Sequence, residues 1–322
     1  MTEDRSIASL RDAYVAGSLA RDDYWQALQR RHFGLAEYSA LVSGRLDRIE
    51  VHADGMRIVL TNGLSFWWDP ADLRTAPNMV VAHGDYEPDE RRVMEVLAEG
   101  AGNVVDIGAN VGWYALHFAR LVGPAGGRVL SFEPVPSTYA VLRRNCELNR
   151  ECEWIELHNL GLSDTPGRAT FSIPQGTGSV AASGRAIKPE ETNATVEVEL
   201  ATLDDVLDAS PRGAISLVKC DVEGAEIFAL RGAVRMLERD RPVLALEMLR
   251  KWTAVYDYHP NDIIDLLAPF GYRCWAIEGG ELAAIDRVTE ETTATNFFFF
   301  VDELHGEKMQ AIRQVRRADD VG

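Results

Sequence analysis

The pattern of apolar and polar positions divides the chain into three parts. Over residues 5–43, apolar side chains recur at helical spacing and are interrupted by charged residues. From Arg48 to Trp68, apolar and polar side chains alternate, with turn signals at Asp54-Gly55 and Asn62-Gly63, which is typical of β-hairpins. We therefore predict a helical segment, either a cap or a dimerisation arm, and then a small β accessory element ahead of the main fold.

In the third part, short apolar runs alternate with amphipathic segments. We predict strands near residues 103–107, 128–133, 153–159, 215–220, 242–247, 271–277 and 295–301. The intervening helices are expected near residues 85–100, 112–122, 136–149, 224–239 and 260–268. Such alternation predicts an α/β fold with a mainly parallel sheet and helices on both faces. No helix is expected between the last two strands, so we predict that they form an antiparallel hairpin.

These patterns also give the expected domain boundaries. We assign residues 1–84 to the accessory region, residues 85–304 to the main domain and residues 305–322 to a tail. Two strand-like pieces flank a Gly/Ser-rich stretch at 174–193 within the main domain. That stretch is too long for a simple connection, and we interpret it as either a mobile lid or a disordered insertion.

Composition narrows the classes of partner. The 322 residues are 46% hydrophobic and 26% charged, with a formal net charge of −17, which argues against a nucleic-acid partner. The four cysteines show no metal-like spacing. No apolar run approaches the roughly 18 residues that a membrane span needs, and the first residues lack a signal-peptide pattern. We expect a cytoplasmic protein with no membrane partner.

The most informative motif is the run from Asp106 to Gly112, a strand followed by a glycine turn. Strand, glycine turn and helix together indicate a site for an adenosine-containing cofactor. Its spacing is Gly-x-Asn-x-Gly, and Asn110 would crowd a pyrophosphate. The acid at Asp106 suits a positively charged ligand group. The motif therefore favours S-adenosylmethionine, which has a sulfonium and no phosphate. An NAD-dependent oxidoreductase and a non-catalytic cofactor-binding protein are the alternatives.

Three further acids are candidates for contacts with this cofactor. Glu133 ends the second strand, where a carboxylate can accept hydrogen bonds from both ribose hydroxyls. Asp164 follows the third strand and either binds the adenine amino group or serves a turn. Glu87 and its neighbour Tyr86 either close over the methionine end or form a surface turn.

A second group of acids ends the fourth and fifth strands. Asp221 and Glu223 follow one strand and Glu247 follows the next, so we expect them to meet in one crevice. Asp221 is the first candidate for the group nearest the reacting atom of a bound acceptor, and the other two would orient that acceptor. All three are also candidate ligands for Mg²⁺. His259 is either an alternative base or simply a residue at a helix start.

Over roughly residues 70–300 the sequence resembles the FkbM-type S-adenosylmethionine-dependent methyltransferases. The resemblance rests on the motifs Asp106-Ile-Gly-Ala-Asn-Val-Gly112, Phe132-Glu133-Pro134, Leu162-Ser163-Asp164, Thr202-Leu-Asp-Asp205, Lys219-x-Asp221-x-Glu223-Gly224, Asp69-Pro-Ala-Asp72 and Gly84-Asp-Tyr-Glu87-Pro88. It implies a Rossmann-like class I methyltransferase fold, with seven strands in the order 3-2-1-4-5-7-6 and the last strand antiparallel.

The resemblance also implies methyl transfer to a hydroxyl of a small molecule, such as a sugar, a polyketide or another natural product. With the motifs, it gives the residues expected at the cofactor: Glu87, Asp106, Gly108, Asn110, Gly112, Glu133, Pro134, Ser163, Asp164 and Asp221. The identity of the acceptor, any need for a metal and a homodimeric state are left open by the sequence.

Overall fold

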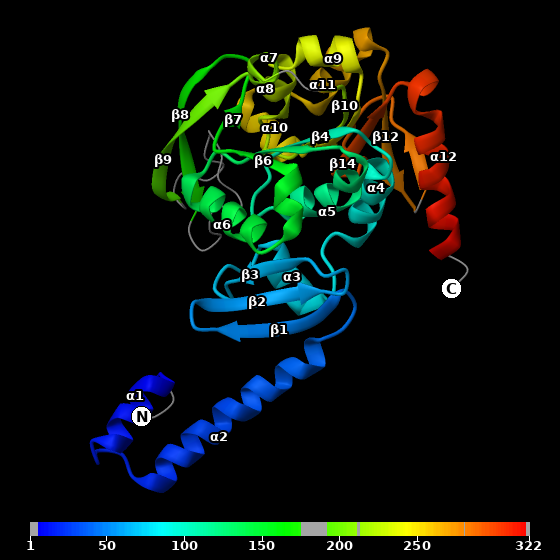
Figure 1. The fold of residues 1–322 in the computed structure, drawn as a ribbon. Coiled ribbons are helices and arrows are strands. Elements are labelled where there is room, and N and C mark those ends of the chain that lie inside the picture. Colours follow the sequence, from blue (N-terminus) through cyan, green and yellow to red (C-terminus); the bar gives the residue numbers. More distant parts are fainter. Residues whose placement is uncertain (1–5, 175–191, 211–212, 280, 320–322) are drawn as a thin grey trace.

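The computed structural model describes residues 6–174, 192–210, 213–279 and 281–319. A central eight-stranded sheet has the order β13-β12-β14-β11-β10-β4-β5-β6 (Figure 1). Its strands are β4 (Asn103–Ile107), β5 (Val129–Phe132), β6 (Ile155–His158), β10 (Ile215–Cys220), β11 (Val243–Glu247), β12 (Arg273–Glu278), β13 (Glu281–Ala284) and β14 (Asn296–Phe300). Strands β6, β5, β4, β10 and β11 pair in parallel, and β14 is antiparallel to both of its neighbours.

The predicted α/β class is confirmed, and so is the antiparallel pairing of the last two predicted strands. The prediction of seven strands was wrong by one, because β13 adds an edge strand next to β12. The sequence gives little sign of β13, since its four residues include one large apolar side chain, Leu282, which is buried.

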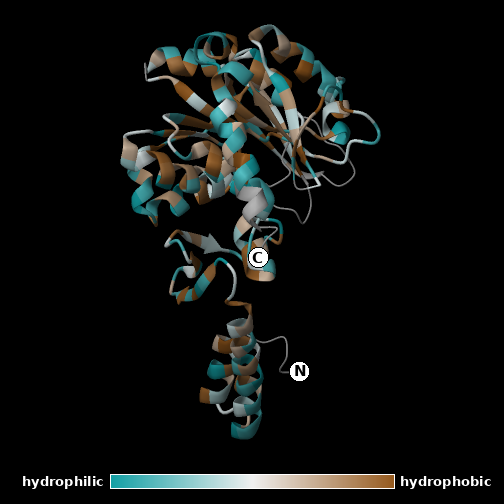
Figure 2. Cartoon of the chain, turned by 90° about the vertical axis from the view of Figure 1, so that its right-hand side faces the viewer, coloured by the Kyte–Doolittle hydropathy of each residue, from teal (hydrophilic) through white to brown (hydrophobic). Residues whose placement is uncertain are grey.

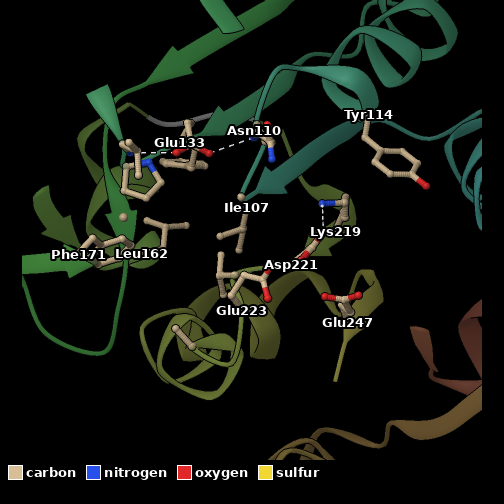
Figure 3. A pocket seen from close by; sticks show the side chains of 18 of the residues that line it. Ile107, Asn110, Tyr114, Glu133, Leu162, Phe171, Lys219, Asp221, Glu223 and Glu247 are labelled. Carbon is tan, nitrogen blue, oxygen red and sulfur yellow. Dashed lines mark hydrogen bonds and ion pairs between the residues drawn. The ribbon is translucent and has the colours of Figure 1, made fainter. Parts of the chain in front are cut away.

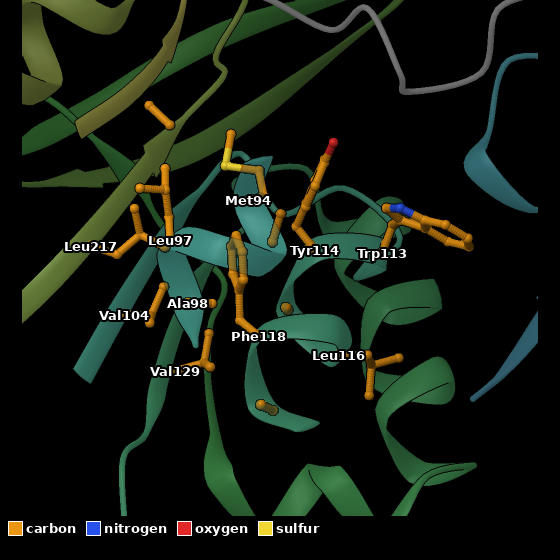
Figure 4. Close-up of a cluster of buried hydrophobic side chains, with 14 of the residues drawn as sticks. Met94, Leu97, Ala98, Val104, Trp113, Tyr114, Leu116, Phe118, Val129 and Leu217 are labelled. Atoms are coloured by element: carbon orange, nitrogen blue, oxygen red, sulfur yellow. The ribbon is translucent and has the colours of Figure 1, made fainter. Parts of the chain in front are cut away.

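Side chains that alternate along β4 contribute to cores on opposite faces of the sheet. Val104 packs in a cluster with residues of α4 (Pro88–Ala98), α5 (Trp113–Val122), α6 (Pro136–Glu147) and α12 (Asp302–Asp319), part of which Figure 4 shows. Val105 belongs to the second cluster, which includes residues of α7 (Leu203–Ala209), α8 (Glu226–Arg231), α9 (Val234–Asp240) and α11 (Pro260–Leu267). The helix expected over 224–239 is thus two helices.

The remaining short helices connect these elements. They are α10 (Arg250–Thr253) and the 3-10 segments η1 (Tyr38–Leu41), η2 (Gly123–Ala125), η3 (Arg150–Trp154), η5 (Ala254–Tyr256) and η6 (Ala268–Phe270). Among the described residues, no helix is both long enough and apolar enough to cross a membrane.

The accessory region contains the predicted helices and hairpins. Helices α1 (Ile7–Val15) and α2 (Arg21–Glu37) lead into an antiparallel sheet of β1 (Leu46–His52), β2 (Gly55–Leu60) and β3 (Ser65–Trp68), followed by α3 (Ala76–His83). Asn145 of α6 joins this sheet to the glycine turn. Its Oδ1 accepts the Trp67 N–H at 2.7 Å, and its Nδ2 donates to the Val111 carbonyl at 2.7 Å.

A third, small sheet contains β7 (Gly161–Leu162), β8 (Gly167–Pro174) and β9 (Thr192–Ala201). Strands β8 and β9 pair antiparallel and correspond to the two strand-like pieces expected at 168–173 and 195–200. Most of the stretch at 174–193, interpreted above as a lid or an insertion, lies outside the described residues.

Candidate active site

A cavity of about 460 Å³ lies where β4, β5, β10 and β11 end (Figure 3). This is the edge where open α/β sheets bind their ligands. The predicted site residues that line the cavity are Glu87, Gly108, Asn110, Glu133, Pro134, Ser163, Asp164, Asp221, Glu223 and Glu247. The structure does not place Asp106, Gly112 or His259 in the lining.

The glycine turn is set by a close approach between two strand ends. Gly108 has φ of +77°, and a Cβ there would lie 1.9 Å from the Asp221 carbonyl oxygen. Glycine is therefore required at this position by both its backbone conformation and the space. Asn110 also has positive φ, at +50°, a conformation that asparagine tolerates better than most residues.

We expect Gly108→Ala to destabilise the fold by clearly more than the roughly 1 kcal/mol typical of an alanine forced to positive φ. Gly126→Ala is the matched control, because Gly126 has φ of +87° and nothing within 4 Å of its added Cβ. Chemical denaturation measures both free energies of unfolding. Equal losses for the two variants would contradict the role of the close approach.

Glu133 is held by the backbone at the cavity wall. Its two carboxylate oxygens accept the N–H groups of Asn110 at 3.0 Å and Val135 at 2.9 Å, and the residue is 6% exposed. Burial raises the pKa of this carboxyl to about 7, against the lowering effect of the two N–H groups. Each oxygen retains a lone pair for a ligand hydroxyl.

Asp106 lies behind the cavity wall and is fully buried. Lys219 contacts it, with Nζ 3.7 Å from Asp106 Oδ1, and also lies 3.3 Å from Asp221 Oδ2. We expected Asp106 to face a positively charged group of a ligand. In the structure, the positive group beside Asp106 is the Lys219 ammonium. Burial lowers the pKa of Lys219, but Asp221 and Asp106 more than offset this, and the pKa is raised. Lys219 therefore carries its charge at neutral pH.

Asp221, Glu223 and Glu247 meet as expected, and they do so in a partly desolvated cluster (Figure 3). Burial, and then the Asp221 charge, raise the pKa of Glu247 to about 9 and that of Glu223 to about 8. Glu247 also shares a hydrogen bond with Asp221. Because two neighbouring carboxylates resist ionising together, Glu247 keeps its proton at neutral pH beside Asp221.

The candidate Mg²⁺ site, which the sequence left open, finds no support in this cluster. Across the part of the chain that the structure describes, no three or more His, Cys, Asp or Glu side chains form a group suited to a metal ion. We therefore assign no metal to the three acids.

Glu87 enters the cavity from the start of α4. It has φ of +45°, and its Oε2 accepts the Tyr114 hydroxyl at 2.7 Å. Burial is the main cause that raises the pKa of Glu87. Tyr86 lines the cavity beside it and packs edge-on against Trp113, with ring centroids 5.7 Å apart.

His259 caps a helix and does not line the cavity. The ring Nδ1 of His259 accepts the backbone N–H of Asn261 at 3.2 Å, and the backbone N–H of His259 donates to the Asp262 carboxylate at the start of α11. The sequence suggested either an alternative base or a residue at a helix start, and the position of His259 agrees with the second.

Other lining residues were missed by the sequence analysis. They include Tyr114 near the acids, the apolar side chains Phe171 and Leu200, and Arg74 and Thr75 from the accessory region. Lys219, Phe132 and Leu162, which belong to motifs quoted above, also line the cavity. The sequence does not distinguish the apolar residues of the cavity wall from those of the core, because both are of the same residue types.

The cavity, the glycine turn and the strand-end acids describe an α/β protein with a candidate small-molecule site, and comparison with known families identifies the class of protein. The family model described as "Methyltransferase FkbM domain" matches residues 106–274, which is just over half of the chain. The chain belongs to this family. The match begins at Asp106 and covers the glycine turn and all the strand-end acids discussed above.

Two curated relatives are named as methyltransferases. "Methyltransferase sdnD" of Sordaria araneosa is 33% identical over 156 residues, covering 40% of this chain and 59% of the relative. "Methyltransferase 1" of Beauveria bassiana (strain ARSEF 2860) is 30% identical over 145 residues, covering 40% and 57%. The matches thus span less than two thirds of either relative's length.

Among solved structures, the methyltransferase FkbM from Methylobacillus flagellatus KT has 19% sequence identity and a TM-score of 0.39. The match covers 63% of this chain and 44% of that chain. At this level of similarity the family assignment rests on the sequence match alone.

Proposed function

We propose that this chain binds S-adenosylmethionine and transfers its methyl group to a hydroxyl of a small molecule. The observation that carries the proposal is that Glu133, which follows β5, lines one cavity together with Asp221 and Glu247, which lie at the ends of β10 and β11. Membership of the methyltransferase family supports this over an NAD-dependent oxidoreductase. A cavity of about 460 Å³ falls within the range of small-molecule sites.

The residues present fit a cationic, phosphate-free cofactor. Asn110 occupies the place of the glycine that a diphosphate would need, and its Oδ1 is buried without a hydrogen-bond partner among the described residues. The cavity is lined mainly by acids and apolar groups. We assign Glu133 to the ribose hydroxyls, Leu162 and Phe171 to the adenine, and Glu87 with Asp221 to the positively charged end.

The chain's own contribution to the reaction is orientation and proton removal. When bound, S-adenosylmethionine supplies a methyl group on a positively charged sulfur. An acceptor hydroxyl has a high pKa and needs a base within hydrogen-bond reach. Asp221 lies beside the protonated Glu247 and the Lys219 ammonium, and we assign it to accept this proton. The assignment of oxygen as the methylated atom comes from the family resemblance.

Incubation with methyl-labelled S-adenosylmethionine and a panel of hydroxylated small molecules tests the proposed activity. We expect a product whose mass has increased by one methylene unit, together with S-adenosylhomocysteine. Cofactor binding without transfer to any acceptor would favour the non-catalytic alternative. Reduction of NAD by a member of the same panel would overturn the proposal.

We expect the affinity for S-adenosylhomocysteine to depend on pH through Glu133. Its pKa is raised to about 7 in the free protein, and the ionised form is the better acceptor for two ribose hydroxyls. The affinity for S-adenosylhomocysteine therefore approaches its maximum above pH 7. It falls as the pH drops through that value, by at most about tenfold per pH unit. Calorimetry from about pH 5.5 to about pH 8, a range that brackets the pKa of Glu133, measures this dependence. An affinity that does not change over this range would contradict the prediction.

A further inference from the structure

Exposed apolar side chains concentrate on the N-terminal helices. Among the described residues, ten large hydrophobic side chains are exposed, and seven of them lie between residues 7 and 42: Ile7, Val15, Trp25, Phe33, Leu35, Tyr38 and Val42. Single exposed hydrophobics are normal on a protein surface, but a cluster of this kind marks an interaction site. This cluster lies far from the cavity described above.

The hairpin of α1 and α2 projects from the rest of the molecule (Figures 1 and 2). The nine residues of α1 are too few to cover the seventeen of α2. Leu10, Ala27 and Leu28 are buried where the two helices meet, and Tyr14 stacks on Tyr24 with ring centroids 4.6 Å apart. The rest of α2, including Phe33 and Leu35, remains uncovered.

Two helices alone do not make a closed core, since each needs a partner for every apolar face. We propose that two copies of this chain associate through their α1–α2 hairpins, forming a four-helix bundle. In such a bundle the exposed side chains of one hairpin pack against those of the other. The projection of the hairpin allows two copies to meet there without contact between the main domains.

Charge favours a second copy as the occupant of this surface. Residues 7–37 contain four arginines and four acidic residues, so the hairpin has no formal net charge, whereas the whole chain carries −17. Two copies that met through other surfaces would bring like charges together. The hairpin is thus the part of the acidic chain where self-association meets the least repulsion.

The apolar area is also sufficient for a dimer. Trp25 is 53% and Phe33 63% exposed, which leaves roughly 100 Å² of each aromatic side chain for burial. The five exposed side chains that lie on α1 and α2 together supply roughly 500 Å² per copy, or about 1,000 Å² for two, which is close to the lower end of specific interfaces.

Light scattering coupled to size exclusion tests the proposal on the full chain. We expect the wild type to have twice the 35.7 kDa mass of one chain, and Trp25→Glu/Phe33→Glu to have the mass of one chain. Val51→Glu is the matched control, because Val51 is 69% exposed on β1 outside the hairpin, and it should remain a dimer.

Two further measurements separate dissociation from misfolding. The double variant should keep the wild-type circular dichroism of the main domain and should bind S-adenosylhomocysteine as the wild type does, because the hairpin contributes nothing to the cavity. Phe33→Glu alone, a smaller change in the same surface, should weaken the dimer at low protein concentration. A monomeric wild type would overturn the proposal, and so would a folded double variant that stays dimeric.

Discussion

Replacing Glu133 with alanine is expected to weaken the binding of S-adenosylhomocysteine by about a hundredfold or more. The carboxylate is assigned to two ribose hydroxyls, and hydrogen bonds to a charged group contribute about 1.5–3 kcal/mol each. Since about 1.4 kcal/mol corresponds to a factor of ten, even the lower figure for both bonds gives this loss. Isothermal titration calorimetry at pH 8, about one unit above the titration of Glu133, measures it directly.

The loss must be separated from damage to the glycine turn, because the variant also leaves the N–H groups of Asn110 and Val135 without their acceptor. Asp204→Ala is the matched control. Asp204 is also 6% exposed, and it likewise accepts two backbone N–H groups, from Arg235 at 2.8 Å and Met236 at 2.9 Å, outside the cavity. Both variants should lose comparable stability, and Asp204→Ala should bind normally. Normal binding by Glu133→Ala would remove Glu133 from the site.

Replacing Asp221 with asparagine is expected to slow methyl transfer by about 10²–10⁴-fold, the usual contribution of a positioned base. The amide has nearly the shape of the carboxylate but cannot accept a proton. Affinity for S-adenosylhomocysteine should change far less than turnover, because Glu133, the apolar wall and Glu87, which shares the positively charged end with Asp221, all remain. Single-turnover kinetics with an identified acceptor measure the rate, and a rate equal to that of the wild type would exclude Asp221 as the base.

Glu247→Gln distinguishes the two members of the acid pair. The pKa of Glu247 is raised to about 9, so at pH 7 its side chain is a neutral hydrogen-bond donor, and glutamine preserves that state. We therefore expect this variant to retain most of its activity at pH 7, in contrast to Asp221→Asn. If Glu247→Gln were the more damaging change, the roles of base and donor would be reversed.

The meeting of Glu133, Asp221 and Glu247 could be predicted from the sequence, because each ends a predicted strand and the carboxyl ends of parallel strands share one edge. The glycine turn was equally accessible, since its Gly-x-Asn-x-Gly spacing is local, whereas the close approach of the Asp221 carbonyl to Gly108 is a tertiary contact that the sequence does not reveal. Roles in catalysis stay predictions for all of these residues. The fold class followed from the same alternation of strands and helices.

Other features depended on neighbours that the sequence does not identify. Lys219 lies beside Asp106 because β10 pairs with β4, a register that the sequence order does not reveal. The bond between Glu87 and the Tyr114 hydroxyl joins the start of one helix to the first turn of the next. The edge strand β13 is short and nearly without a hydrophobic pattern.

Titration of the wild-type protein with S-adenosylhomocysteine, and separately with NAD, tests the central claim most directly. The account predicts saturable binding of one S-adenosylhomocysteine per chain with a micromolar dissociation constant, and no binding of NAD at the same concentrations. Folded protein that binds NAD, or that binds no S-adenosylhomocysteine, would contradict it.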